Sequence, residues 1–213
     1  MSANLMSLAR NGGKFLKLFG DRKMMKLLPY DAEVEYLEST GTQFIDTGAI
    51  IKYSDVAEAV ASINNRGSIF GYINSQKQQR FNVTGGSGKF SYAYFGQSNT
   101  SFGNTITSYD TKYKFALGDG KFIIDGTIVG TKEYTDETLY EPLVLFARKT
   151  YAKIDDYLVG KIYSFSVKRN GVKIFDYIPV RVGTVGYMYD RVSGQLFGNS
   201  GTGAFIIGPD KTI

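Results

Sequence analysis

The chain has 213 residues and a net charge of +5, with 43% hydrophobic and 21% charged residues, which is the composition of a globular protein. It contains no His and no Cys. Their absence excludes Ser-His-Asp and Cys-His nucleophilic sites, zinc sites built from these ligands, and disulfides. The 25 Gly, 16 Tyr and 15 Phe, with only 4 Pro, are typical of strands joined by tight turns.

The N-terminal segment 1–29 differs from the rest of the chain in charge. It carries six basic residues and one acid, so it accounts for the whole net charge, and residues 30–213 are neutral. Such asymmetry indicates an interaction segment. We therefore expect a basic N-terminal arm, 1–29, and one domain, 30–213. No apolar stretch is long enough for a secretory signal or a transmembrane helix, so we expect no standard export.

Apolar residues of the arm recur in pairs near a helical period, although Gly12-Gly13 and Gly20 interrupt them. Asp21 is placed to cap a short helix that stops before Pro29. The arm is therefore predicted to be partly helical, and it needs a surface to fold on. Its own domain, another protein, a membrane and nucleic acid all stay open, and we favour another protein. The predicted anchoring residues are Lys14, Phe15, Leu18, Phe19, Arg22, Lys23, Met25, Lys26 and Leu28.

From residue 33 onward the chain is a series of short alternating runs that predict strands. The alanines of one segment, Asp55–Ile63, would also tolerate a helix. The predicted strands are Glu33–Glu38, Gln43–Asp46, Val56–Ile63, Ser68–Ile73, Arg80–Val83, Lys89–Phe95, Lys112–Leu117, Lys121–Asp125, Leu143–Phe146, Lys161–Lys168 and Val172–Val180.

Turn residues separate these runs. Asp125-Gly126 and Asn170-Gly171 each predict a type I′ hairpin. More than ten short strands without intervening helices predict an all-β fold, a two-sheet antiparallel jelly-roll sandwich.

Two segments carry a family resemblance. Residues 35–48 have the sequence EYLESTGTQFIDTG, and residues 176–199 contain DYIPVR, GYMYD and GQLFGN. They resemble the concanavalin A-like, laminin-G-like jelly-roll domains of gut bacterial and bacteriophage proteins. The resemblance spans about residues 33–208 and implies a jelly-roll fold, a surface or virion location, and contact with glycans. The arm lies outside it.

The sequence shows no catalytic motif. Glu33 and Glu35 would share a strand face, but no strand motif of the glucanase type, with three spaced acids, is present. Asp155-Asp156 lies in a polar loop, where a calcium site is an alternative to carboxylates that solvate a turn. We therefore expect no enzyme activity, no cofactor and no metal.

Glycan binding needs exposed aromatic rings beside polar groups. The candidates are Tyr92, Tyr94, Tyr151, Asp155, Tyr187 and Tyr189. The alternative for each tyrosine is packing in the sandwich with its hydroxyl at the rim. The neutral charge of 30–213 speaks against nucleic acid as a partner of the domain.

These observations lead to one hypothesis and one alternative. The hypothesis is a non-enzymatic bacteriophage virion structural protein, a head fibre or a capsid or tail decoration, assembled in the bacterial host cytoplasm. Its arm would bind other virion proteins, its jelly roll would contact host glycans, and by family analogy it would be a homo-oligomer, with a trimer as the expected state. The alternative is a carbohydrate-binding module of a gut bacterium. A glycoside hydrolase is a third interpretation, which would need a carboxylate pair in a cleft.

Overall fold

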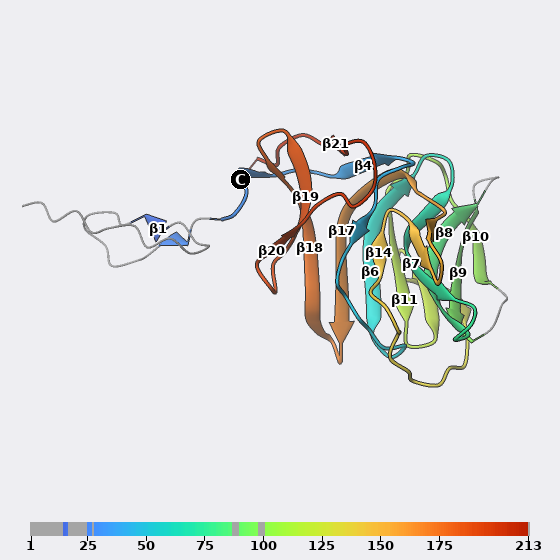
Figure 1. Cartoon of the computed structure of the whole chain (residues 1–213). Helices are drawn as coiled ribbons and strands as arrows, with labels where there is room; N and C mark the ends of the chain where they lie inside the picture. The colour runs from blue at the N-terminus through green and yellow to red at the C-terminus, as the bar shows by residue number, and fades with distance from the viewer. Residues whose placement is uncertain (1–14, 17–24, 27, 87–89, 98–100, 213) are drawn as a thin grey trace, which may run out of the picture.

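The computed structural model describes residues 15–16, 25–26, 28–86, 90–97 and 101–212. Within these ranges the chain forms strands and no α-helix, so no described helix is available to cross a membrane. Two largely antiparallel sheets face each other as a sandwich (Figure 1). The predicted all-β jelly-roll class is confirmed.

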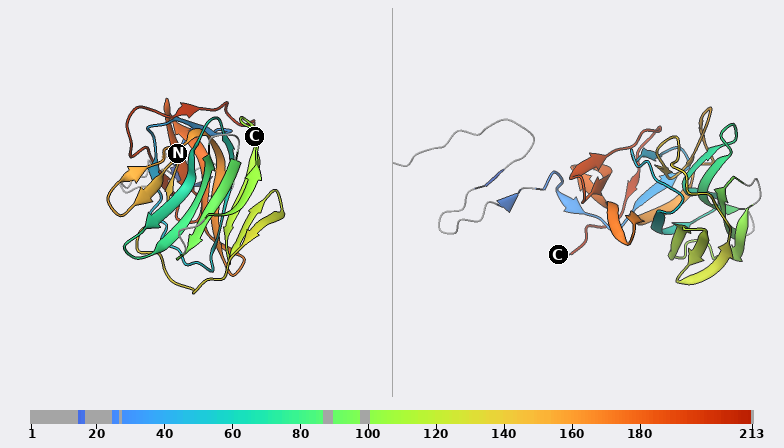
Figure 2. Two further views of the ribbon diagram at one scale, coloured as in Figure 1. Left: turned by 90° about the vertical axis from the view of Figure 1, so that its right-hand side faces the viewer. Right: turned by 90° about the horizontal axis from the view of Figure 1, so that it is seen from below.

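The smaller sheet has eight strands in the described part of the chain. These are β5 (Ile45–Asp46), β7 (Gly67–Asn74), β8 (Gln79–Gly86), β9 (Phe90–Gly96), β10 (Phe102–Ile106), β14 (Val144–Leu145), β15 (Arg148–Thr150) and β16 (Ile154–Asp155). The main path runs in the order β10-β9-β8-β7-β14-β5, and β15 and β16 pair beside β7. Figure 2 (left) looks onto this sheet, with the β15–β16 hairpin at its border.

The larger sheet has eleven strands among the described residues. These are β3 (Ala32–Glu33), β4 (Leu37–Thr40), β6 (Val56–Ile63), β11 (Tyr113–Gly118), β12 (Lys121–Ile124), β13 (Thr127–Thr131), β17 (Val159–Arg169), β18 (Val172–Val182), β19 (Val185–Asp190), β20 (Gln195–Phe197) and β21 (Ile206–Ile207). The main path runs in the order β13-β12-β11-β6-β17-β18-β19-β20.

The chain passes repeatedly from one sheet to the other. After β6 in the larger sheet it builds β7 to β10 in the smaller one, returns for β11 to β13, crosses again for β14 to β16, and ends in the larger sheet. Both predicted type I′ hairpins are present, with positive φ angles of 48° and 82° at Asp125-Gly126 and of 50° and 79° at Asn170-Gly171.

An aromatic core fills the space between the sheets. The rings of Phe70 in β7 and Phe165 in β17 meet across it with centroids 5.3 Å apart. The alanines of β6 alternate inward at positions 57, 59 and 61 and are buried. A period of two is that of a strand, so the helix that was an alternative for Asp55–Ile63 does not form, and Val56–Ile63 is strand β6.

In the arm, the structure describes two short strands. Phe15–Leu16 (β1) pairs antiparallel with Met25–Lys26 (β2). At these four residues the expected helix is wrong, and the sequence offers a reason, since Gly20 between the two strands weakens a helix by about 1 kcal/mol relative to Ala. The other predicted anchors Lys14, Leu18, Phe19, Arg22 and Lys23 lie outside the described residues, and Leu28 is exposed.

Candidate functional site

Strand β8 is buried on both of its faces. Phe81 and Val83 point into the sandwich, while Arg80, Asn82 and Thr84 lie on the outer face and are only 5%, 0% and 2% exposed. The outer face of an antiparallel sandwich ordinarily meets water and carries solvated polar groups. Buried polar side chains there show that something covers this part of the smaller sheet.

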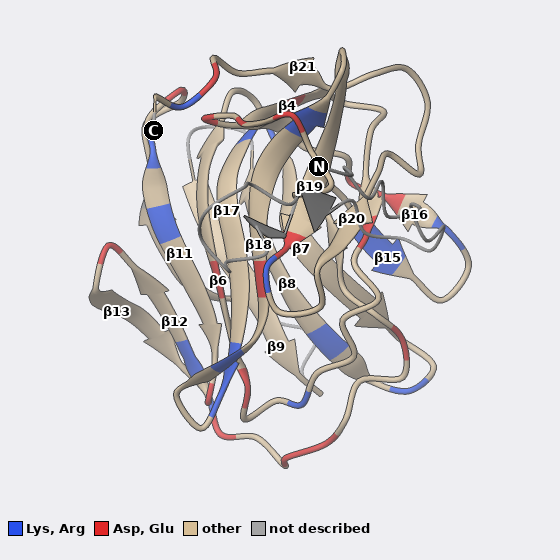
Figure 3. Cartoon of the chain, turned by 90° about the vertical axis from the view of Figure 1, so that its left-hand side faces the viewer, with Lys and Arg blue, Asp and Glu red and all other residues tan. Residues whose placement is uncertain are grey.

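Part of the cover is the segment that contains β15 and β16. The carboxylate of Asp156 accepts hydrogen bonds from the hydroxyls of Ser68 at 2.6 Å and Thr84 at 3.0 Å, which fixes this segment to the outer face of β7 and β8. The hairpin also has an internal ion pair. Arg148 Nε donates to Asp155 Oδ1 at 2.9 Å, and Arg148 Nη1 lies 3.9 Å from Asp156 Oδ2. Figure 3 shows β15 and β16 side by side, with blue basic and red acidic residues.

Two tyrosines of β9 complete this surface. Tyr92 lies opposite Thr84, and Tyr94 lies opposite Asn82. Both are half-buried, and their ring centroids are 5.7 Å apart at an interplanar angle of 78°. Burial raises the pKa of Tyr92, and the neighbouring Tyr94 and the charge of Asp156 raise it further. The phenol of Tyr92 is therefore neutral at physiological pH and stands close to Asp156.

The guanidinium of Arg148 keeps its charge in this setting. Burial alone would lower the pKa of Arg148, but its hydrogen bond to Asp155 and the charges of both aspartates outweigh burial and raise that pKa. We call this surface the β8 patch. It consists of Asn82, Thr84, Tyr92, Tyr94, Arg148, Asp155 and Asp156.

The β8 patch contains an amide without partners, that of Asn82. Neither the Oδ1 nor the Nδ2 atom of Asn82 makes a hydrogen bond, although both atoms are buried. Gly71 lies opposite Asn82 in β7 and leaves room for the amide, since a Cβ built on Gly71 would lie 1.9 Å from Asn82 Oδ1. Buried polar groups are nearly always hydrogen-bonded in folded proteins, so this amide calls for a partner from outside the chain.

The structure brings some of the predicted glycan residues together and separates others. Tyr92, Tyr94 and Asp155 converge in the β8 patch, and Tyr151 lies in the turn of the same hairpin, 59% exposed. Tyr187 and Tyr189 lie on the other sheet, in β19. Tyr189 is buried and packs edge-on against Tyr30 with centroids 5.0 Å apart.

Sequence reasoning missed Asn82, Thr84 and Arg148. Asn82 and Thr84 belong to a run in which polar and apolar residues alternate, and this pattern is typical of any strand whose outer face is exposed to water. Arg148 is distant from them in sequence and reaches the face only through the fold. Asp155 and Asp156, considered above as calcium ligands, bind Arg148, Ser68 and Thr84. Within the described ranges no group of three acidic, His or Cys side chains is placed to hold a metal ion.

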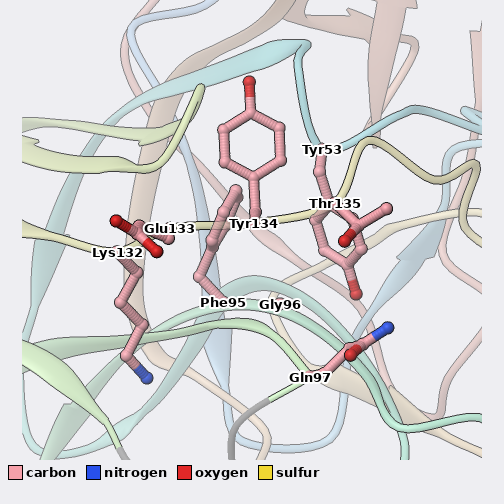
Figure 4. Close-up of a pocket in the computed structure, with 8 residues that line it drawn as sticks. All are labelled: Tyr53, Phe95, Gly96, Gln97, Lys132, Glu133, Tyr134 and Thr135. Carbon is pink, nitrogen blue, oxygen red and sulfur yellow. The ribbon is translucent and has the colours of Figure 1, made fainter.

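A hollow of about 310 Å³ lies at one end of the sandwich, between the end of β9 and residues 132–135. The polar ends of Tyr53 and Gln97 approach each other there, while Tyr134 points away (Figure 4). Gln97 donates to Glu137 at 3.1 Å, and Tyr134 donates to Asp119 at 2.9 Å. These two side chains already have protein partners, which makes this hollow a weaker candidate than the β8 patch.

A second hollow of about 590 Å³ lies on the outer face of the larger sheet, where the β17–β18 ladder ends. Glu33 and Glu35 both line it. Glu33 is held by the Tyr30 hydroxyl at 3.3 Å and by Lys211 at 3.7 Å. Lys112 covers the ring of Tyr163 at 4.2 Å from its centroid. The aromatic surface in this hollow is thus already occupied by a lysine.

Comparisons with known proteins bear on the fold. No protein-family model matches the chain, and no curated protein matches it. Among solved structures, a protein from Bacteroides ovatus, provisionally described as carbohydrate-binding, is similar at 10% identity with a TM-score of 0.56 over 84% of this chain. The chain spans 61% of the length of that protein. A heptameric SAP-like pentraxin from Limulus polyphemus aligns over 85% of this chain and 96% of its own, at 11% identity and a TM-score of 0.49. The first similarity agrees with the jelly-roll sandwich fold seen here.

Proposed function

We propose that the chain is a carbohydrate-binding jelly-roll module and that the β8 patch is its binding site. One observation carries the proposal: two half-buried tyrosine rings, one of them opposite Asn82, lie on the same face as a fixed arginine–aspartate pair and a buried amide that lacks any partner. A sugar presents apolar C–H faces and a rim of hydroxyl groups. Ligand sites combine aromatic surface with a few fixed polar groups, and the β8 patch offers both.

The ion pairs of the patch favour this chemistry. Arg148 carries five N–H donors in a rigid fork, and Asp155 and Asp156 offer acceptor oxygens beside it. A hydroxyl group both donates and accepts hydrogen bonds, so adjacent donors and acceptors suit it. Because the salt bridges already fix these side chains, less rotamer entropy is lost when a ligand binds.

The structural similarity supports this proposal over the virion hypothesis. The Bacteroides ovatus protein, provisionally described as carbohydrate-binding, shares the jelly roll over most of this chain. Neither the structure nor the comparisons provide an observation that points to a bacteriophage particle. Anchoring by the arm, oligomerisation and a virion location therefore stay predictions from the sequence.

A binding screen with matched variants tests the proposal. The full chain is tested against a panel of immobilised polysaccharides, and each hit is measured by calorimetry. Tyr94→Ala should weaken binding on the order of tenfold or more, because it removes one stacking surface. Tyr187→Ala, on the other sheet, is the matched control and should leave affinity unchanged. The proposal fails if no polysaccharide is retained, or if Tyr187→Ala abolishes binding and Tyr94→Ala does not.

A further inference from the structure

We infer that the ligand of the β8 patch is a neutral saccharide, that Asn82 recognises it through a group that both donates and accepts hydrogen bonds, and that acidic saccharides are excluded. This inference rests on the proposed function and specifies its ligand class. It follows from the charges of the patch, from the hydrogen bonds that the unpaired amide of Asn82 can make, and from the side chain that covers this amide.

The charge balance of the patch disfavours an acidic ligand. Its one cation, Arg148, is bonded to Asp155 and faces Asp156, so the three groups together carry a charge of −1. A ligand carboxylate or sulfate would have to approach two aspartates to reach one arginine that they already neutralise. Like charges within a few ångströms repel each other strongly where water is excluded.

The neighbouring basic residues do not change this balance. Lys149 is held by Glu141 at 2.8 Å and lies 3.8 Å from Asp46. Lys153 Nζ lies 4.0 Å from Asp155 Oδ2, but its side chain is 70% exposed, so water screens this pair and it offsets little of the negative charge of the two aspartates. Arg80 lies two residues before Asn82 on the outer face of β8, but its Nη1 donates to the carbonyl of Gln97 beyond the end of β9, at 2.9 Å. Each of these three residues therefore has a protein partner, and Arg148 is the one cation within the β8 patch as defined above.

The amide of Asn82 specifies the complementary group. It offers an acceptor oxygen and two N–H donors, and all of them are unused. A carboxylate or sulfate only accepts hydrogen bonds, so it would leave Oδ1 unpaired and facing another negative oxygen. A hydroxyl or an acetamido group donates and accepts, and can pair with both ends of the amide. Neutral sugars and N-acetylated sugars present these groups.

Access to the amide requires one side chain to move. Asn82 has no exposed surface, and its two cross-strand neighbours are Gly71, which has no side chain, and Tyr94, which is half-buried. We assign the movement to Tyr94. A change of its rotamer would uncover the amide and turn the ring toward the ligand, while the backbone ladder of β8 and β9 stays intact. Side-chain rotation of this kind is common at binding surfaces whose backbone is fixed.

The test compares neutral and acidic polysaccharides on the same protein. The full chain is assayed against neutral glucan, mannan, xylan and chitin oligomers, and against polygalacturonate, alginate and a sulfated glycan. We expect binding to members of the neutral group only, with an affinity that changes little between low and high salt. Asn82→Leu should weaken that binding at least about tenfold. Asn82→Ser keeps a donor and acceptor and should retain part of the binding.

The matched control is Ser62→Ala. Its hydroxyl is also buried and unpaired, but it lies in β6 of the other sheet, so binding should not change. If only acidic glycans bind, and added salt weakens their binding, the neutral-ligand inference is wrong, while the proposed carbohydrate binding stands. If neutral glycans bind equally well to Asn82→Leu, the role of Asn82 is wrong. If no glycan in either group binds, both the inference and the proposed function fail.

Discussion

Replacing Asn82 by leucine should stabilise the unliganded protein, although it removes a polar group that we assign to ligand binding. A buried donor or acceptor without a partner costs roughly 1–3 kcal/mol, and Asn82 leaves two such atoms unpaired. Leucine branches at the same carbon and fills a similar shape with apolar groups. It is slightly larger, and overpacking in a tight site costs about 1–3 kcal/mol. We expect a net gain of about 1–2 kcal/mol in the free energy of unfolding.

Thermal and urea unfolding measure this gain. For a protein of this size, a stabilisation of 1 kcal/mol raises Tm by about 2–4 °C, so Asn82→Leu should melt a few degrees above the parent chain. Ser62→Ala removes one unpaired hydroxyl in the other sheet and should give a smaller gain. Asn82→Leu should combine higher stability with lost glycan binding, a combination expected of a residue retained for function.

One result would refute this reasoning. If Asn82→Leu lowers the free energy of unfolding by more than about 1 kcal/mol while Ser62→Ala does not, the amide of Asn82 has a stabilising partner in the free protein. A bound water bridging Asn82 to the patch would be such a partner. The unpaired amide would then no longer indicate a ligand.

Three further predictions concern ionisable groups elsewhere in the sandwich. Arg169→Ala should cost roughly 3 kcal/mol in urea unfolding, because it leaves the buried carboxylate of Asp55 without its bidentate partner. Arg181→Ala breaks an equally short but exposed pair and should change little. Burial alone would raise the pKa of Glu58, but ion pairs with Lys114 and Lys168 lower that pKa below the ordinary 4.5. The ionised carboxylate therefore stabilises the fold at neutral pH. Glu58→Gln should have a lower free energy of urea unfolding than the parent chain at neutral pH, and this difference should vanish in acid, where Glu58 is protonated. Burial raises the pKa of Tyr53 from 10.0 to about 12, so its contribution to stability should be lost as the pH rises above 10. Thermal melts of Tyr53→Phe should therefore show a smaller loss of stability above pH 10 than the parent chain.

The fold could be predicted where the sequence pattern is local. The alternation in Lys161–Lys168 predicts a strand, and β17 contains it. The dipeptide Asn170-Gly171 predicts a tight hairpin, and both residues have positive φ. The short strands were not predictable in this way. β15 and β16 have three and two residues, and they are strands because β7 and the Arg148–Asp155 ion pair hold them in place. Such elements depend on tertiary contacts more than on propensity.

The candidate site was predictable only in part, for the same physical reason. Tyr92 and Tyr94 alternate with Ala93, so a strand assignment places both rings on one face. That their partners are Arg148 and Asp155 depends on how the β15–β16 hairpin folds beside β7. Asn82 gave the opposite signal, because a polar residue in an alternating strand predicts exposure to water, and the structure buries it completely.

The backbone of the covering hairpin supports the assignment of the β8 patch as a binding site. Two non-glycine residues with positive φ flank the hairpin, Phe146 at 65° before β15 and Asp156 at 50° after β16. A bulky residue such as Phe rarely adopts this conformation, and each such residue costs about 1–3 kcal/mol. These two turns bring Arg148, Asp155 and Asp156 onto the outer face of β7 and β8. The turn at Phe146 also serves the core, where the centroid of its buried ring lies 4.7 Å from that of Phe205. The turn at Asp156 acts on the outer face, because the carboxylate that it positions bonds Ser68 and Thr84 and thereby fixes the donors and acceptors that we assign to ligand binding.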